Sequence, residues 1–147
     1  ADFGGVAAEM LAEVSEVGLW GLFRHPVAPV WTAENTAILG DAAHPTLPFM
    51  AQGAVMAMED AWVLADALHR ADSIAAGLAA YQARRHDRVS RVIAAAGSNA
   101  WKYHLSFPPL RLAAHLGLRL ASQVAPRRLL QQFDWIYRHD VTREIGA

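Results

Sequence analysis

Apolar residues recur at helical spacing along most of this chain, and the first such stretch lies near its start. Val6, Met10, Leu11 and Val14 follow that spacing, and three glutamates are available for the opposite face. Spacing of this kind is typical of a helix with one apolar side. The pattern therefore predicts an amphipathic helix over about residues 3–14.

Longer helical stretches follow, separated by residues that interrupt helices. The first runs from about residue 52 to residue 70 and has apolar residues on nearly all sides, so we expect it to be buried between other layers. The second covers about residues 74–98, and Asp72-Ser73 offers it an N-cap. A third covers about residues 110–124, and Pro126 begins a last one.

Two short apolar runs are typical of strands instead. Residues 19–23 are aromatic and aliphatic and end near Pro26, which predicts a strand followed by a loop. Residues 36–39 end at Gly40-Asp41 and predict a buried strand that leads into a turn. Open α/β sheets bind ligands at the carboxyl ends of their strands, and a glycine without Cβ lets a ligand approach the backbone. The carboxylate of Asp41 is thus a candidate acceptor for sugar hydroxyls.

The loop after this turn leads to the start of the long helix. Pro45 and Pro48 each fix a φ angle, so we expect the loop to be shaped, neither helical nor floppy. A helix that begins at Gln52 has Gly53 in its first turn, where unpaired N–H groups and the helix dipole attract negative charge. Each feature alone is most often an ordinary turn or a core helix. Their combination favours a ligand site.

Composition narrows the class of protein. The 147 residues suit one domain, with 54% hydrophobic and 18% charged residues, which does not favour disorder. A formal charge of -1 gives no general attraction to nucleic acid or anionic lipid. The absence of cysteine excludes disulfides and thiol catalysis and fits a reducing, cytoplasmic location. No apolar run reaches the roughly 20 residues of a membrane span.

Other sites of chemistry receive less support from the sequence. None of the seven histidines has the spacing of a metal site, and we expect His44 to pack in the core instead of orienting a ligand. No serine stands in a G-x-S-x-G context. Glu59 and Asp60 are neighbours and diverge on a helix, so we expect a structural role and no acid/base dyad. The arginines between residues 84 and 91 predict a solvated face that pairs with acidic neighbours, and Trp31 is expected to pack.

Residues 39–61 as a whole resemble the second flavin-binding motif of the class A FAD-dependent aromatic monooxygenases. The likeness is greatest to salicylate hydroxylase-like and 3-hydroxybenzoate 6-hydroxylase-like members. The segment 81–85, the Tyr-His pair before the Pro-Pro break and residues 134–140 are also similar to this family. The resemblance thus extends over nearly the whole chain from Leu19 onward.

The resemblance implies an FAD site built from this motif. Asp41 would bind the ribityl chain, and Gly53 and Ala54 would offer N–H groups to the pyrimidine edge of the flavin. The full implied cofactor set is Gly40, Asp41, Pro48, Gln52, Gly53 and Ala54. Pro48, Phe49 and Met50 would form the substrate-pocket wall where the isoalloxazine ring meets an aromatic substrate. No metal is implied, and no residue is a confident acid or base.

The implied fold is α/β, and the chain would be its C-terminal, mainly helical portion with a few strands near the start. Residues 1–50 would end a substrate-side region and lead into the flavin motif, and residues 51–147 would form the helical C-terminal part of the FAD-binding domain. Gly4-Gly5 does not supply the G-x-G-x-x-G fingerprint of a dinucleotide-binding βαβ unit. We therefore expect that N-terminal unit to be absent and the chain to be part of a longer enzyme.

The implied reaction is hydroxylation of a phenolic aromatic ring with NAD(P)H and O2, through a flavin C4a-hydroperoxide, with FAD carrying the hard chemistry. Expected partners are a small aromatic substrate, the missing N-terminal half of the FAD domain, and a second copy in a homodimer. The chain alone is expected to be inactive. Alternatives are a ubiquinone-biosynthesis hydroxylase, an epoxidase, an inactive chain that docks onto a separate N-terminal half, or a non-catalytic helical binding module.

Overall fold

The computed structural model describes residues 4–100 and 105–143, and this part of the chain is mainly helical with two short strands. The prediction of a mainly helical segment with a few strands near its start is therefore confirmed for the secondary-structure content. Its elements in order are α1 (Val6–Ala12), β1 (Thr32–Ala33), β2 (Thr36–Ala37), η1 (Gly40–Ala42), η2 (Pro48–Met50), α2 (Gly53–Arg70), α3 (Ile74–Ala100), α4 (Pro108–Val124), α5 (Pro126–Gln131) and α6 (Asp134–Tyr137), where η marks a 3-10 turn.

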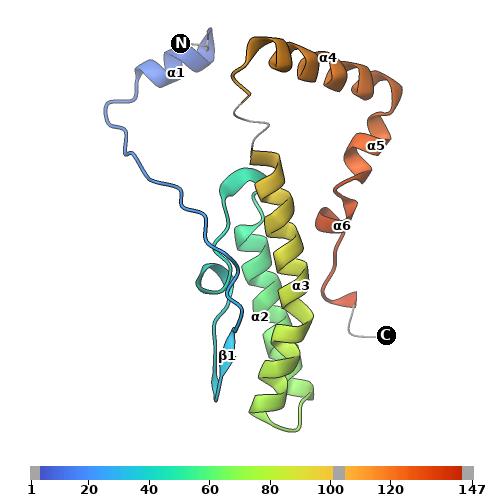
Figure 1. Ribbon diagram of the computed structural model, residues 1–147. Coiled ribbons are helices and arrows are strands. Elements are labelled where there is room, and N and C mark those ends of the chain that lie inside the picture. Colours follow the sequence, from blue (N-terminus) through green and yellow to red (C-terminus); the bar gives the residue numbers. More distant parts are fainter. Residues whose placement is uncertain (1–3, 101–104, 144–147) are drawn as a thin grey trace.

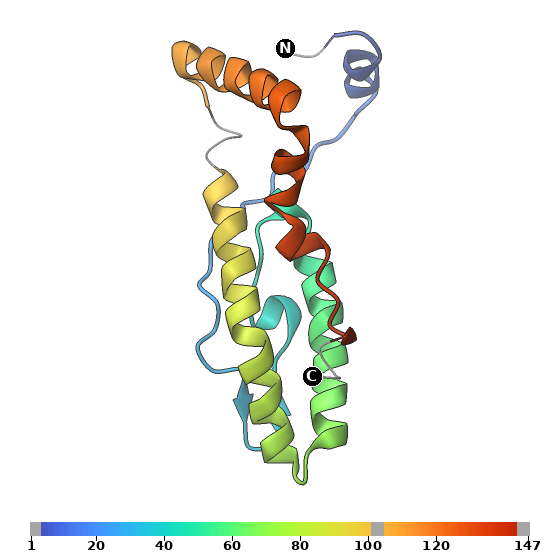
Figure 2. The same cartoon turned by 90° about the vertical axis from the view of Figure 1, so that its right-hand side faces the viewer.

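A hairpin of the two long helices, α2 and α3, forms the centre of the molecule (Figure 1). Its helices begin and end close to the predicted positions, because the signals for their ends are local. The Ser73 hydroxyl accepts a hydrogen bond from the Ala76 N–H at 3.2 Å, which confirms the predicted N-cap of α3. The segment that carries β1, β2 and η1 packs along the hairpin (Figure 2).

The core lies between this segment and the two helices. Trp31 is buried, its ring Nε1 donates to the Ala28 carbonyl at 2.7 Å, and its backbone N–H donates to the Gln82 side chain at 2.8 Å. The prediction that Trp31 packs is therefore confirmed. The other buried apolar residues are Ala43, Met50, Met56, Val63, Ala67, Leu78, Tyr81, Val89, Val92, Ala96, Ile136 and Val141.

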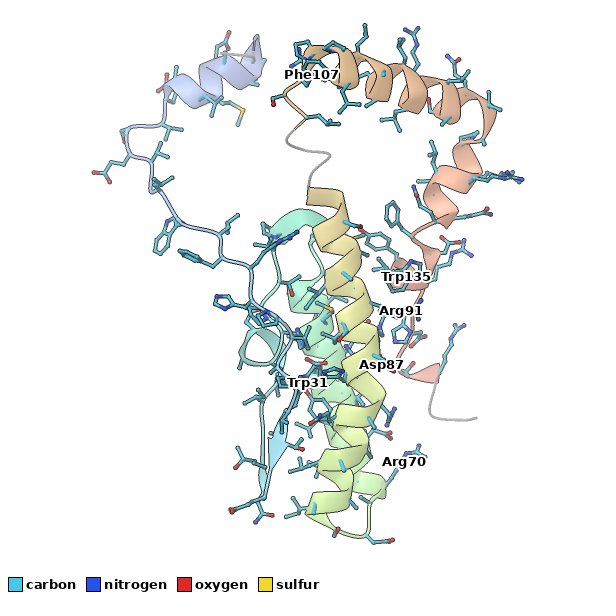
Figure 3. All side chains as sticks on the ribbon, viewed as in Figure 1. Trp31, Arg70, Asp87, Arg91, Phe107 and Trp135 are labelled. Atoms are coloured by element: carbon cyan, nitrogen blue, oxygen red, sulfur yellow. The ribbon has the colours of Figure 1, made fainter. Side chains whose placement is uncertain are left out.

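The C-terminal helix α6 returns to the hairpin. Arg88 on α3 donates to the carbonyls of Trp135 and Ile136 at 3.2 and 3.3 Å. The Arg91 guanidinium lies over the Trp135 ring, 4.8 Å from its centroid (Figure 3). A cation over an indole face is favourable, so these contacts fix α6 against α3.

Both strand predictions need correction. Residues 19–23 form no strand: they are exposed, and within the described part of the chain no strand pairs with them. The run at 36–39 is not a buried strand either. Only Thr36–Ala37 forms a strand, which pairs with Thr32–Ala33. The chain then leaves this two-stranded sheet and continues to η1. A strand depends on a partner, which an apolar run alone does not supply.

The other corrections concern burial and local helicity. One face of α2 is buried against α3, but Val55, Met58, Trp62 and Leu68 on the rest of the helix are exposed, so the expected burial on all sides is wrong. The loop expected to be non-helical contains the 3-10 turn η2, which begins at a proline that suits a first turn. The predicted family-like Tyr103-His104 pair lies outside the described residues.

Helices α1 and α4 have little packing of their own. Neither α1 nor α4 contains a buried residue, and both lie beyond the end of the hairpin in Figure 1. Over residues 4–100 and 105–143, no helix combines the length and the hydropathy that crossing a bilayer requires.

Candidate functional site

The predicted Gly-Asp turn is the 3-10 turn η1, and it packs directly on helix α2. Gly40 has a φ of 56°, in the left-handed region that favours glycine. A Cβ at this position would lie 3.1 Å from the Cβ of Ala57, so glycine also permits the close approach to α2. The Gly40 carbonyl accepts the N–H groups of Ala43 and His44 at 3.0 and 2.8 Å, which closes the turn and leaves the Asp41 side chain exposed.

The loop that follows ends in a strained residue next to the helix. Ala51 has a φ of 52°, a left-handed conformation that costs a non-glycine residue roughly 1–2 kcal/mol. Strained residues of this kind often lie at ligand sites. The Ala51 N–H bonds to the Pro48 carbonyl at 3.3 Å, and α2 begins two residues later at Gly53.

The start of α2 presents free hydrogen-bond donors. The N–H of Met56 is the first in the helix to bond back, to the Gln52 carbonyl at 2.9 Å, and Gln52 caps nothing with its side chain. Among the described residues, no hydrogen bond reaches the N–H groups of Gly53, Ala54 or Val55. With the helix dipole behind them, these donors suit an anion or a carbonyl oxygen.

A pocket of about 460 Å³ lies between the turn η1, the loop that follows it and the start of α2. It is lined by Asp41, Thr46, Leu47, Pro48, Ala51, Gly53, Ala54 and Ala57. Four of the predicted cofactor residues, at positions 41, 48, 53 and 54, therefore lie around one space. The sequence analysis did not name Ala57, although its place one helical turn after Gly53 could have revealed it.

The remaining predicted residues lie behind or beside the pocket. Gly40 is buried beneath the turn, and Gln52 is buried with its amide directed to the Met50 carbonyl at 3.4 Å. Met50 belongs to the hydrophobic core and does not line the pocket. Pro48 is an exposed pocket residue, and the structure does not describe the side chain of Phe49.

A buried cluster of charged groups supports the turn from behind. Asp60 is fully buried, and its Oδ2 accepts the Gly40 N–H at 3.0 Å and lies 2.5 Å from His44 Nε2. Its Oδ1 accepts from Arg85 Nε at 2.7 Å. Arg85 is 1% exposed and also pairs with Glu59 at 2.8 Å. Arg88 completes the cluster, with its Nη2 2.8 Å from the same glutamate.

This cluster changes two of the predictions. Glu59 and Asp60 do have a structural role, but their carboxylates meet on one guanidinium, so they converge where the helix spacing indicated divergence. The arginines do pair with acidic neighbours, as predicted, yet Arg85 is buried and the face is not simply solvated. His44 is buried, as expected, with its ring centroid 5.3 Å from that of Trp31, and it also binds a carboxylate.

Electrostatics keep this cluster ionised. Burial acts to raise the pKa of Asp60, but hydrogen bonds from His44 and Arg85 outweigh it and lower the pKa. Burial likewise opposes ionisation of Glu59, and Arg88 and Arg85 nevertheless lower its pKa. Burial and then the charge of Asp60 raise the pKa of Tyr81, so its hydroxyl stays protonated and donates to the Ile38 carbonyl at 3.2 Å.

The pocket has the chemistry that a flavin nucleotide needs. An exposed carboxylate can accept hydrogen bonds from ribityl hydroxyls, and free N–H groups can donate to ring carbonyls. A Cβ added at Gly53 would lie 4.0 Å from Asp41 Oδ1 and 3.9 Å from the Thr46 Cβ, so a side chain there would grow between the donors and the carboxylate. The residues that are present therefore fit FAD.

Comparison with known proteins identifies the class. Residues 6–96 match the family described as "FAD binding domain", and the chain belongs to this family. The resemblance to the class A FAD-dependent aromatic monooxygenases is confirmed, and FAD is the cofactor of this class.

Individual relatives are monooxygenases of aromatic compounds. The chain is 34% identical over 131 residues to 3-amino-4-hydroxybenzoate 2-monooxygenase PtmB3 of Streptomyces platensis, covering 88% of this chain and 32% of that protein. It is 43% identical over 82 residues to 3-hydroxybenzoate 6-hydroxylase 2 of Aquipseudomonas alcaligenes, covering 55% and 25%. It is 40% identical over 88 residues to 6-hydroxynicotinate 3-monooxygenase of Pseudomonas fluorescens, covering 58% and 23%. The chain thus spans a third or less of the length of these relatives.

Proposed function

We propose that this chain forms the flavin-facing part of an FAD-dependent monooxygenase that hydroxylates a phenolic aromatic ring. One observation carries the proposal: Asp41, Gly53 and Ala54 line the same pocket, and no hydrogen bond within the described residues reaches the N–H groups of Gly53 and Ala54. A carboxylate for sugar hydroxyls and donors for ring carbonyls are thereby combined in one space of about 460 Å³.

The residues in and behind the pocket have three roles in this proposal. Asp41 accepts hydrogen bonds from the ribityl hydroxyls. Gly53 and Ala54 donate backbone hydrogen bonds to the pyrimidine edge, where the positive end of the α2 dipole favours an anionic, reduced ring. Gly40 and Gln52 are buried and hold the turn and the start of the helix in place.

The substrate we propose is a phenolic aromatic acid. The names of the three relatives above specify a hydroxybenzoate or a hydroxynicotinate, each an aromatic ring with a carboxylate and a hydroxyl group. Pro48 lines the pocket and supplies part of the local apolar surface on which such a ring would lie. It has no acidic or basic group, so this chain contributes position and shape to the reaction.

The electrons come from outside the chain. Bound FAD would supply the redox chemistry, with NAD(P)H as the two-electron reductant and O2 as the source of the new hydroxyl and of one water, and the protein would position the cofactor. In this proposal a separate dinucleotide-binding unit holds the ADP half of FAD, residues 1–50 lead in from the substrate side, and residues 51–147 form the helical part of the FAD domain.

Titration with FAD tests the proposal, with flavin fluorescence or equilibrium dialysis as the readout. We expect Asp41→Ala to weaken FAD binding about tenfold or more, because it removes hydrogen bonds to a charged group. Asp87→Ala is the matched control, since Asp87 is an exposed carboxylate on α3 outside the pocket. Equal FAD affinity in Asp41→Ala and the parent would remove Asp41 from its role.

The same titration should be made on the 147-residue chain and on a protein extended upstream in its reading frame. Binding by the extended protein supports the proposal and justifies a screen of phenolic acids for stimulated NAD(P)H oxidation. If neither protein binds FAD, the motif does not form a flavin site, and the helical binding module becomes the better hypothesis.

A further inference from the structure

Both oxygens of the buried Asp60 carboxylate accept hydrogen bonds. Their partners lie in or next to the Gly-Asp turn and on helix α3. One oxygen, Oδ2, accepts the Gly40 N–H at 3.0 Å and faces His44 Nε2 at 2.5 Å. The other, Oδ1, accepts from Arg85 Nε at 2.7 Å. No exposed surface remains on Asp60, so the group cannot act on a ligand directly.

The two partners of Oδ2 bracket the residue that faces the pocket. Gly40 immediately precedes Asp41, and His44 follows it by three positions and closes the turn through its N–H bond to the Gly40 carbonyl at 2.8 Å. A single oxygen atom on α2 thus holds both ends of the turn. Because only three residues lie between Gly40 and His44, holding both of them restricts the backbone from which the Asp41 side chain extends.

The oxygen that holds the turn is itself held by the second long helix. Arg85 on α3 binds Asp60 and Glu59 together, at 2.7 and 2.8 Å, and is 1% exposed. Tyr81, one helical turn earlier, donates to the Ile38 carbonyl just before the turn at 3.2 Å. The position of the turn is therefore set by both helices of the hairpin.

We propose that Asp60 and His44 are positioning residues that aim the Asp41 carboxylate into the pocket and thereby set the affinity for the hydroxylated chain of the flavin. The inference rests on the proposed FAD site and names two residues behind it. Loss of such a supporting contact typically weakens a binding site about 10–100-fold in the metal sites where it has been measured.

The primary test compares two isosteric substitutions on the same helix. Asp60→Asn removes the charge that holds the turn. Asp66→Asn is the control, because Asp66 also joins α2 to α3, through Arg84 at 2.8 Å, and has no contact with the turn. We expect Asp60→Asn to raise the Kd for FAD about tenfold or more and Asp66→Asn to leave it unchanged. Thermal unfolding of both variants shows how much stability each one loses.

Hydrogen exchange provides a readout that does not require flavin. In the FAD-free protein, Asp60→Asn should accelerate exchange of the amide hydrogens of Gly40, Ala43 and His44 by a larger factor than exchange along α2. Asp66→Asn should not have this effect. Equal acceleration along the whole helix would mean that Asp60 only stabilises the fold, and it would overturn the inference.

A second pair of variants decides the matter if Asp60→Asn does not fold. His44→Leu removes the donor to Asp60, and His44→Gln keeps an N–H that can reach it. We expect His44→Leu to weaken FAD binding and His44→Gln to restore much of it. The inference is overturned if His44→Leu binds FAD as tightly as the parent, or if His44→Gln binds as weakly as His44→Leu.

The outcomes separate this inference from the function on which it rests. If the parent binds FAD and Asp60→Asn binds equally well, the positioning role is wrong and the cofactor site stands. If the parent and the upstream-extended protein both fail to bind FAD, the cofactor site is wrong and the positioning role is overturned with it.

Discussion

At the scale of single residues, the backbone conformation at Gly40 limits which residue types this position accepts. Its φ of 56° is left-handed, and an added Cβ would lie 3.1 Å from the Ala57 Cβ. We expect Gly40→Ala to lower the free energy of unfolding by roughly 1–2 kcal/mol, the cost of a left-handed conformation for a residue with a Cβ. It should also weaken FAD binding, because the turn beneath Asp41 must shift.

Urea unfolding measures this loss, and Gly117→Ala is the control. Gly117 lies within α4, where an added Cβ meets nothing within 4 Å, so alanine there should cause no loss of stability. If Gly40→Ala were as stable as the parent, the turn would have to be free to adopt another conformation.

Four of the pocket residues could be predicted from the sequence because they lie close together in it. Asp41, Pro48, Gly53 and Ala54 fall within fourteen residues, so local turn and helix chemistry brings them to one space. The contact between Asp60 and Arg85 could not be predicted in this way. It depends on how α2 and α3 are aligned, which the packing of the whole hairpin determines.

At the scale of elements, the α2–α3 hairpin should lose stability in acid. Asp60 and Glu59 have pKa values below their usual range because the hydrogen bonds and charges of His44, Arg85 and Arg88 outweigh burial. A carboxyl group whose pKa is lower in the folded state stabilises the fold above its unfolded pKa of about 4, and this stabilisation is lost as the pH falls through the folded value. We therefore expect the free energy of unfolding to fall below about pH 4.

Urea unfolding at a series of pH values, followed by circular dichroism, checks this expectation. Asp60→Asn should be less stable at neutral pH and should show a shallower fall in acid, because one of the responsible groups no longer titrates. A parallel acid dependence in the two proteins would show that Asp60 is not one of the groups responsible.

The positions of the helices could be predicted from the sequence better than the positions of the strands. The ends of α2 and α3 were predicted within about two residues, because caps and prolines are local signals. The strand predicted at residues 19–23 was wrong, because its apolar run has no partner strand in the described part of the chain. The burial of α2 was overestimated for a related reason: its composition indicated neighbours on faces where the described chain has none.

At the scale of the whole molecule, apolar surface remains uncovered. Residues 14–23 carry exposed Trp20 and Phe23, α2 exposes Met58 and Trp62, and α4 has no buried residue. Exposed apolar surface over several elements is typical of faces that contact another protein segment. The described chain therefore has a core of its own and also large faces suited to association.

We expect the purified chain to self-associate and to bind an apolar dye such as ANS, with a size that increases with concentration in size-exclusion chromatography. Leu116 is 57% exposed on α4, so Leu116→Glu should shift the chain towards the monomer and lower dye binding. Gln123→Glu is the control for added charge, because Gln123 is a neutral, exposed residue on the same helix and the substitution also adds one negative charge. A monodisperse chain that binds neither dye nor FAD would instead indicate a self-sufficient helical binding module, because a flavin-enzyme segment should retain surface for the rest of its enzyme.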